Sequence, residues 1–536
     1  MTRWILMLAA AVAYAAVLSF FSVRAHLGLQ TQMNDLGNAD QSLWAASQGD
    51  WNMTTSNHPD GVLRGRLALH ANLIFWPISL LYRLWPDPIL LLLLASLGCA
   101  AAGLGLFALA RLRLGSASWW TLAPPAAFFF SPLVQSANLY DFHDVTLTTA
   151  FLVWAIWAFE SERPRAGWLL LALALLCKED VAAVVMMLGL REVLAGRRRR
   201  GWKIVLAGGL YGALVMGVLV PLINRGEFSI ATPGPAERYM WVLEHPEGLA
   251  ELIIRPDRLR LILYLLLSGA VVAWRAKSWL LLTIPALLLG ILSWTTWMTR
   301  LTGTYYWITA QAFVILACLD AGAGSRRGRA LGSRFPLVYL LAATALFSWL
   351  FSPLPYGYGA FWENYGIPDL RAVEDAKAIV APEMAASVQN NLGPHFSHRT
   401  DIAAYPRRSD SADAVVLHLR YLGGPASGFF VRTAPRLMYR MGIEPLAEGV
   451  RRLARSPGWG LAYNRDGVYV FLRGRESILP LDEILSRIDA DEVLMAASYE
   501  EALRHRSALA RLIVEDLSWS DLAGILARKR PEDREP

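Results

Sequence analysis

The segment AGWLLLALALLCKEDVAAVVMMLGL at residues 166–190 decides how this chain is organised. Its two apolar runs have 12 and 10 residues, whereas a helix needs about 20 residues to cross a bilayer core about 30 Å thick. Basic residues flank both ends of the segment, and basic loops favour the cytoplasmic face of a membrane. The sequence therefore predicts a broken helical hairpin at 166–195. Lys178, Glu179 and Asp180 form its tip, within or near the outer half of the membrane.

The remainder of residues 1–352 has the composition of a membrane protein. Of the 536 residues, 55% are hydrophobic and 18% are charged, whereas a soluble domain carries about 25% charge. Residues 1–352 contain 28 basic and 19 acidic residues, separated by long uncharged stretches. These features exclude a soluble enzyme, a disordered chain and a small disulfide-linked domain. Nine further apolar runs are expected to form membrane helices: Trp4–Val23, Pro88–Ala110, Leu114–Tyr140, Val145–Phe159, Ile204–Ile223, Leu261–Trp274, Ser278–Thr299, Leu301–Leu319 and Phe335–Phe351.

The loops between these runs set the expected orientation. Basic residues gather at every second connection, as at Arg111 and in the run Arg197–Arg200, and Arg3 precedes the first helix. Since basic loops remain on the cytoplasmic side, the N-terminus is expected there. The two helices of the hairpin bring the count to 11, and an odd count places residues 353–536 outside the cytoplasm. The expected fold is an α-helical polytopic protein of the inner cell membrane with a C-terminal α/β extracytoplasmic domain.

The regions outside the membrane divide into three parts. Residues 24–86 form the first outer loop, in which 65–86 are expected to be an interfacial amphipathic helix. Residues 353–475 mix helix-like and strand-like patterns, with a hairpin signal at Asn464–Gly467, and predict an α/β domain. Residues 476–536 predict a helical extension with a frayed, charged end. All three cysteines lie in apolar runs, so the outer domain is expected to fold without a disulfide or a cysteine metal motif.

Polar residues next to a membrane are costly to place, so each cluster of them is a candidate site. The first cluster follows the first helix and contains Asp35 and Asp40. A carboxylate in this outer loop can take the proton of an attacking hydroxyl, which makes Asp35 a candidate general base. Capping of the next helix by Asp35 or Asn38 is the alternative.

The second cluster connects two membrane runs and contains Asp141, His143 and Asp144. His143 is a candidate ligand of a phosphate. Asp141 and Asp144 are candidate ligands of a hard divalent cation such as Mg²⁺ or Mn²⁺, and no other cofactor is predicted. The alternative is a hydrated loop in which Asp144 caps the following helix.

The third cluster is the hairpin tip, where Lys178 can neutralise a lipid phosphate. Glu179 and Asp180 stand beside it. Broken helices at membrane depth are tolerated where they line a cavity. An internal salt bridge that holds the hairpin together is the alternative.

The fourth cluster is His70, with Arg64 and Arg66, on the expected interfacial helix. A lone histidine is more often packed or exposed than functional, so this cluster ranks below the others. Two weaker candidates are the outer loop with Arg238, Tyr239 and Trp241, and Thr304–Trp307, where an aromatic belt at the membrane surface is the favoured interpretation.

Four motifs occur in one order along the chain. They are Asp35-Leu36-Gly37 with Asp40-Gln41-Ser42-Leu43-Trp44, Asp141-Phe142-His143, Lys178-Glu179-Asp180, and Gln389-Asn390-Asn391-Leu392-Gly393-Pro394-His395-Phe396-Ser397-His398-Arg399. Together, over residues 30–475, they resemble the polytopic membrane proteins of domain-of-unknown-function family 2079. The layout is in turn similar to that of the GT-C membrane glycosyltransferases, which include protein O-mannosyltransferases and aminoarabinose transferases.

The GT-C resemblance implies a sugar transferase that acts at the outer face of the membrane. Its implied partners are the lipid bilayer, a polyprenyl-phosphate hexose or pentose as donor, and an acceptor that is a lipid, glycan or protein. By that resemblance Asp35 is the general base and Lys178 contacts the phosphate. GT-C enzymes usually have paired acids in the first outer loop, whereas here Asn34 precedes Asp35. The predicted substrate-binding set is Asp40, His70, Asp141, His143, Asp144, Lys178, Glu179 and Asp180.

Two other classes of protein remain as alternatives. A transporter or flippase of lipid-linked substrates also uses broken helices with buried charges, although the sequence shows no inverted repeat. A non-catalytic membrane scaffold would use the acids only as helix caps. The basic excess lies largely in loops that set orientation, so it does not indicate a nucleic-acid partner.

Overall fold

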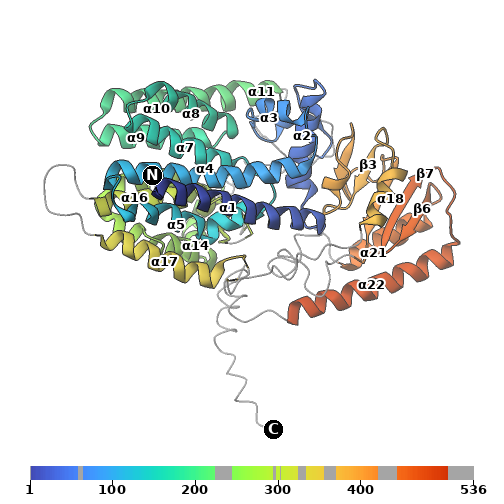
Figure 1. The fold of residues 1–536 in the computed structure, drawn as a ribbon. Helices are drawn as coiled ribbons and strands as arrows, with labels where there is room; N and C mark the ends of the chain where they lie inside the picture. The colour runs from blue at the N-terminus through green and yellow to red at the C-terminus, as the bar shows by residue number, and fades with distance from the viewer. Residues whose placement is uncertain are drawn as a thin grey trace, which may run out of the picture.

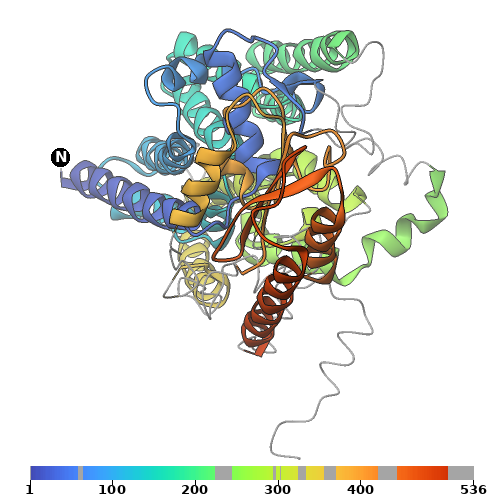
Figure 2. The same ribbon diagram turned by 90° about the vertical axis from the view of Figure 1, so that its right-hand side faces the viewer.

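The computed structural model describes residues 2–57, 64–223, 244–293, 297–301, 303–323, 334–354, 356, 370–420 and 443–504. These residues form a helical bundle with a smaller α/β part at one end of it (Figure 1). Viewed from that end, the α/β part lies in front of the helices (Figure 2). The weaker candidates Arg238, Tyr239 and Trp241 and residues 505–536 of the predicted extension lie outside the described residues.

Three helical stretches are long and apolar enough to cross a membrane. They are α1 (Thr2–Leu27), α4 (Pro88–Leu114) and Arg198–Ile223, which comprises α10 (Arg198–Leu214), η4 (Val215–Leu219) and α11 (Val220–Ile223). Shorter apolar helices pack with them: α7 (Val145–Glu160), α8 (Pro164–Cys177), α15 (Ile284–Leu292), α16 (Ile308–Ala323) and α17 (Phe335–Phe351). α16 is buried along most of its length and contacts α4, α5 (Ala123–Phe129), α7 and α17.

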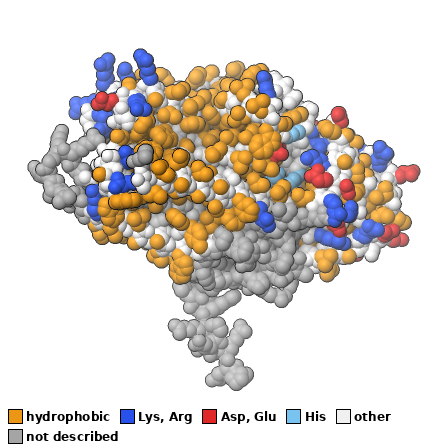
Figure 3. All heavy atoms as spheres, in the orientation of Figure 1, with side chains coloured by type: hydrophobic (Ala, Val, Ile, Leu, Met, Phe, Trp, Pro, Cys, Tyr) orange, Lys and Arg blue, Asp and Glu red, His pale blue; other side chains and the backbone are white. Residues whose placement is uncertain are grey.

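The outer surface of the bundle is apolar, as a lipid-facing surface must be. Large hydrophobic side chains are exposed on several helices, and hydrophobic atoms form a broad band between the charged ends of the molecule (Figure 3). A soluble monomer rarely exposes apolar patches of this extent. The exposed side chains include Leu8, Val12 and Phe20 on α1, Leu206, Leu210 and Leu214 on α10, and Val338, Leu346 and Trp349 on α17.

Prolines divide one of the predicted spans. The expected single span Leu114–Tyr140 is instead the tail of α4 followed by η3 (Trp119–Leu122), α5 and α6 (Pro132–Leu139). Prolines stand in the first turn of both α5 and α6. Because proline lacks an N–H group and clashes with the preceding turn, it starts a helix far more readily than it continues one. An uncharged run was therefore not enough to predict one helix.

Two further expectations are corrected near the α/β part. The predicted span Leu301–Leu319 becomes helical only at Ile308, because the segment before it turns at Gly303, whose φ is 68°. The predicted interfacial helix 65–86 is reduced to α3 (Phe75–Tyr82).

Residues before α3 make other contacts. β1 (Thr54–Thr55) pairs with β2 (Arg64–Gly65), a short 3₁₀ turn follows, and the backbone N–H of Ile74 donates to Leu176 O at the end of α8. The segment between β2 and α3 is thereby directed against the tip of the α8–α9 hairpin rather than along the membrane surface.

The hairpin consists of α8 and α9 (Val181–Leu194). α8 ends at Cys177 because Lys178 has extended backbone angles, and α9 begins directly after Asp180. α8 packs against α7 and α9 packs against α10. The three charged residues of the tip therefore lie at the end of the bundle that faces the α/β part.

The α/β part is built on a five-stranded sheet of order β4-β3-β5-β7-β6. β3 (Ala386–Val388) is parallel to β4 (Ile402–Ala404) and β5 (Ala414–His418). β7 (Val468–Arg473) is antiparallel to β5 and to β6 (Trp459–Arg465). The helices of this part are α18 (Arg371–Ile379), α21 (Ile443–Arg455) and α22 (Leu481–Arg504).

The conserved-order motif at residues 389–399 joins the α/β part to the bundle. Met33 N donates to Asn390 O over 2.7 Å, and Gln41 Nε2 donates to Arg399 O over 2.6 Å. A Cβ atom on Gly393 would lie 2.3 Å from Met33 Cβ, so only glycine allows this approach. The motif thus fastens the sheet to the segment after α1.

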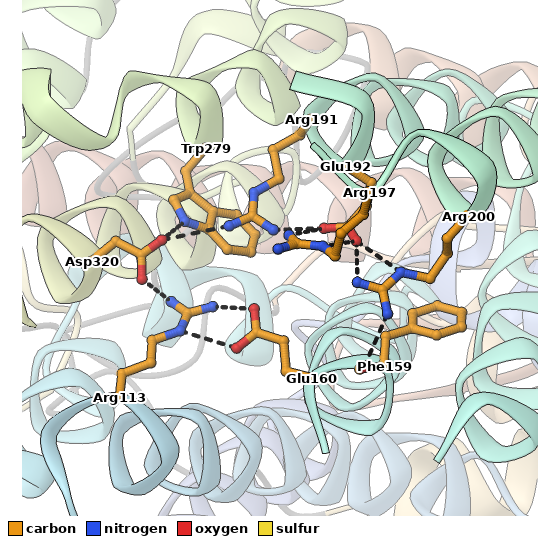
Figure 4. Close-up of polar contacts among 9 residues, drawn as sticks. All are labelled: Arg113, Phe159, Glu160, Arg191, Glu192, Arg197, Arg200, Trp279 and Asp320. Carbon is orange, nitrogen blue, oxygen red and sulfur yellow. Dashed lines mark hydrogen bonds and ion pairs between the residues drawn. The ribbon is translucent and has the colours of Figure 1, made fainter. Parts of the chain in front are cut away.

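Ion pairs close the opposite end of the bundle (Figure 4). Arg113 bridges Glu160 over 2.7 Å and Asp320 over 2.8 Å. Glu192 accepts from Arg191 and Arg197, each over 2.6 Å, and from Arg200. The Arg191 guanidinium lies 3.6 Å from the ring centre of Trp279, whose indole N–H donates to Asp320. These contacts connect the ends of α4, α7, α9, α10 and α16.

Candidate functional site

A cavity of about 500 Å³ lies where the bundle meets the α/β part. Its walls come from the segment after α1, the loop before α3, the connection from α6 to α7, the hairpin tip, the turn before α16 and one residue that follows β4. Six of the predicted site residues line it: Asp35, His70, His143, Asp144, Lys178 and Asp180.

Asp35 lies in η1 (Met33–Gly37), a single π-helical turn that places its carboxylate at the cavity. Tyr140 OH donates to Asp35 Oδ2 over 3.3 Å, and His143 Nε2 lies 3.6 Å from Asp35 Oδ1. Burial lowers the pKa of His143 well below its usual value, and the nearby charges of Lys178 and Arg66 lower it further. The imidazole beside Asp35 is therefore neutral at neutral pH.

Tyrosines hold His143 in place. The Tyr305 ring stacks on the imidazole with ring centres 3.4 Å apart, and the Tyr140 ring stacks at 5.5 Å. Lys178 Nζ lies 5.9 Å from the Tyr305 ring centre. Tyr305 and Tyr306 both line the cavity, so the expectation that they belong to an aromatic belt is corrected: the turn at Gly303 carries them inward.

The hairpin tip divides its charges between the cavity and the loop before α3. Lys178 and Asp180 face the cavity, with Lys178 Nζ 3.9 Å from Asp180 Oδ2. Glu179 does not line it: its carboxylate is 2.9 Å from His70 Nδ1 and accepts from Ala71 N over 3.0 Å. Glu179 therefore positions His70, whose ring lines the cavity.

Asn72 connects the loop before α3 to the start of α7. Its Nδ2 donates to Asp144 Oδ2 over 2.6 Å and to Cys177 O over 2.9 Å, while its Oδ1 accepts from Arg66 Nε over 2.9 Å. Asp144 lies in the connection before α7. Burial raises its pKa to about 7, although Lys178 and the Asn72 hydrogen bond oppose the shift. Asp144 thus titrates near neutral pH.

Two predicted site residues lie outside the cavity lining. Asp40 is buried in α2 (Asn38–Ser47), where Tyr82 OH donates to its Oδ1 over 2.8 Å and His398 Nε2 lies 3.1 Å away. Asp141 Oδ2 accepts from Gln32 N over 2.9 Å. Of the two candidate cation ligands, only Asp144 faces the cavity. Within the described part of the chain, no group of three His, Cys, Asp or Glu side chains is placed to hold a metal ion.

Several cavity residues were not singled out from the sequence. Asn57 and Asn72 lie in a long polar loop with no spacing that marks them. Arg407 follows β4, and its partners Asn34 and Asn57 are about 350 positions earlier in the chain. Only Asn34 and Asn38 carried a usable signal, because they stand four residues apart beside Asp35 in a helical stretch.

Comparison with known proteins supplies a family but no activity. The family model described as predicted membrane protein (DUF2079) matches residues 25–422, a range that contains every residue lining the cavity. No curated protein and no solved structure matches the sequence. Since the family model covers well over half of the chain, this protein belongs to the DUF2079 family of predicted membrane proteins.

Proposed function

We propose that this protein transfers a sugar from a polyprenyl-phosphate donor to an acceptor hydroxyl at the outer face of the membrane. The observation that carries the proposal is the gathering of Asp35, His143 and Lys178 around one cavity at one end of the bundle. Their connections are 100 or more residues from Asp35 along the chain, so the fold itself assembles an acid, an imidazole and a cation there.

The cationic side of the cavity suits a lipid phosphate. Arg66, His70 and Lys178 line it, and arginine and lysine are the side chains that bind phosphate oxygens most strongly. Leu69, Phe75 and Val181 line the same cavity and provide an apolar surface for the first units of a polyprenyl chain. The rest of the chain would lie along the apolar exterior of the bundle.

Asp35 supplies the base in this proposal. The acceptor oxygen attacks the anomeric carbon, the bond from that carbon to the phosphate oxygen breaks, and Asp35 takes the hydroxyl proton. The polyprenyl phosphate leaves with the bonding electrons, and Lys178 stabilises the charge that develops on it. Because lipid phosphate is a good leaving group, positioning and charge stabilisation supply most of the acceleration.

The orientation belongs to the same proposal. The end of the bundle that carries the cavity and the α/β part faces outward, the N-terminus is cytoplasmic, and about 11 membrane helices hold the chain in the inner cell membrane. Arg197 and Arg200 at the opposite end agree with a cytoplasmic location for that end.

Release of polyprenyl phosphate by purified protein in liposomes tests the function. A panel of polyprenyl-phosphate hexoses and pentoses is supplied as donors. We expect turnover of at least one donor and a loss of about 100-fold or more in Asp35→Asn, since general-base catalysis contributes about 10²- to 10⁴-fold. Asp87→Asn is the matched control, because Asp87 caps α4 outside the cavity.

Three outcomes separate the rival functions. Equal turnover by Asp35→Asn and the unaltered protein would remove Asp35 from the base role. Donor binding without release of polyprenyl phosphate would indicate a flippase or another lipid-binding protein. Absence of any donor binding would leave a scaffold.

A further inference from the structure

One wall of the cavity comes from the α/β part. Arg407 lies in the turn after β4, and its guanidinium lines the cavity together with Asn34, Asn38 and Asn57 from the first outer loop. The backbone at this point is fixed, because Arg407 N donates to Ala404 O over 3.0 Å and Ser387 Oγ donates to Arg407 O over 2.8 Å. The sheet therefore determines where this side chain stands.

The four side chains form one hydrogen-bonded network. Arg407 Nη1 donates to Asn34 Oδ1 over 3.1 Å and to Asn57 Oδ1 over 3.0 Å. Asn57 Nδ2 donates to Asn34 Oδ1 over 3.3 Å and to Asn38 Oδ1 over 3.2 Å. Ala404 N donates to Asn57 Oδ1 over 2.8 Å. The carbonyl oxygens of Asn34 and Asn57 each accept two hydrogen bonds in this network.

The network decides what kind of group this wall can recognise. A carbonyl oxygen has two lone pairs, so those of Asn34 and Asn57 are filled. A carboxamide nitrogen carries two hydrogens and a guanidinium carries five, so the remaining capacity of the wall is mainly for donating. Such a wall suits a molecule that offers several oxygen atoms as acceptors.

Contacts run from this wall to the cationic one. Asn34 precedes Asp35 in η1, Asp35 is 3.6 Å from His143, and His143 stacks on Tyr305. Lys178 then lies over the other side of the Tyr305 contact, at 5.9 Å. The proposed base thus stands between a donor-rich amide wall and a cationic wall. A transfer reaction needs this order, with its base between the acceptor and the leaving phosphate.

We infer that Arg407, with Asn34 and Asn57, binds the acceptor, and that this acceptor is a neutral, oxygen-rich molecule such as a sugar or other polyol. The inference rests on the proposed function and deepens it, because it assigns one half of the cavity to the second substrate. It also gives the α/β part a role: the acceptor site is incomplete without Arg407.

The test compares acceptor and donor kinetics in the full-length protein in liposomes. The acceptor probes are fluorescent neutral mono- and disaccharides, and donor hydrolysis by water is measured without them. In Arg407→Gln we expect the acceptor KM to rise about 10- to 100-fold, as loss of hydrogen bonds from a charged group predicts. The donor KM and the hydrolysis rate should change less than about twofold. Arg407→Lys should lie between, because an ammonium keeps the charge but not the fork.

Controls keep the result interpretable. Arg475→Gln removes an exposed arginine of the α/β part and should change neither KM. Thermal unfolding of each variant shows whether the sheet still folds; if Arg407→Gln does not fold, Arg407→Lys decides the question. An unchanged acceptor KM, an altered donor KM, or preference for an acidic sugar or a serine peptide over neutral sugars would overturn the inference.

A binding experiment separates this inference from the proposed function. Titration calorimetry with the same neutral disaccharides needs no turnover. Binding that Arg407→Gln abolishes, in a protein that transfers no sugar, would support the acceptor site and refute the transferase. Transfer that is lost in Asp35→Asn but insensitive to Arg407 would support the transferase and refute the acceptor site.

Discussion

The two ends of the helical bundle are both rich in charge, yet they use it differently. At the end away from the sheet, Glu192 accepts from three arginines, and Arg113 is held between two carboxylates (Figure 4). At the cavity end, Lys178 lies 3.9 Å from Asp180, and both side chains line an open volume of about 500 Å³. Charge is consumed inside the protein at one end and displayed to a cavity at the other.

This difference qualifies the rule that an ionisable residue at a membrane marks function. Buried ion pairs also satisfy charges without doing chemistry, and removal of one partner then exposes the cost of the other. What distinguishes the two ends is whether the charged atoms border a void. The predictions below ask whether loss of a charge affects folding or substrate, in order of decreasing expected effect.

The largest effect is expected at the closed end. Glu192→Gln would leave three arginines facing a neutral side chain, and breaking such a buried pair costs about 3–5 kcal/mol. We expect a correspondingly lower free energy of unfolding, measured by thermal denaturation, with turnover per folded molecule unchanged. Glu162→Gln, an exposed residue of the same end, is the control. A stable Glu192→Gln protein with reduced turnover would reverse the contrast between the ends.

The next effect is expected at the open end. Lys178→Gln should raise the donor KM about 10- to 100-fold, because hydrogen bonds to a charged group contribute about 1.5–3 kcal/mol. Thermal stability should change little, since Lys178 holds no carboxylate at close distance among its recorded contacts. Lys203→Gln on the exposed face of α10 serves as the control for loss of a lysine. A stability loss as large as that of Glu192→Gln would make Lys178 a structural residue.

The same contrast explains what the sequence could and could not predict. Apolar runs broken by Lys178-Glu179-Asp180 predict where helices stop, and alternate connections predict that Asp35, His143 and Lys178 reach one end. Whether a charge borders a void depends on contacts far apart in sequence, as between Asn34 and Arg407. The sequence also concealed the inward turn of Tyr305, because an aromatic residue beside an apolar run equally fits the membrane surface.

Asp40 offers a smaller test, because it stands at the open end but is held like a residue of the closed one. Its carboxylate is buried between Tyr82 and His398. Asp40→Asn should lower the free energy of unfolding by about 1.5 kcal/mol, the value of a hydrogen bond to a charged group, and leave turnover within about twofold of the unaltered protein. Turnover as low as that of Asp35→Asn would show that Asp40 acts on substrate despite its position.

The smallest expected effect is a pH dependence that belongs to the open end. With a pKa raised to about 7, chiefly by burial, Asp144 is neutral below this pH and negatively charged above it. The donor is a phosphodiester with one fixed negative charge, so its repulsion by Asp144 grows as the pH rises through 7. We expect the donor KM to rise about fivefold from pH 6 to pH 8, as for two charges near 4 Å apart in a watery site.

The other groups at this cavity allow the cause to be isolated. Burial lowers the pKa of His70 and of His143, so both rings stay neutral across most of this range, and Arg66 remains charged. Asp144→Asn should therefore remove the pH dependence while keeping the hydrogen bond with Asn72, and its donor KM should match that of the unaltered protein at pH 6. A donor KM that still rises with pH in Asp144→Asn would assign the titration to another group, Asp180 being the next carboxylate at the cavity. In that case the adjustable charge would belong to the hairpin tip, and Asp144 would resemble the paired acids of the closed end.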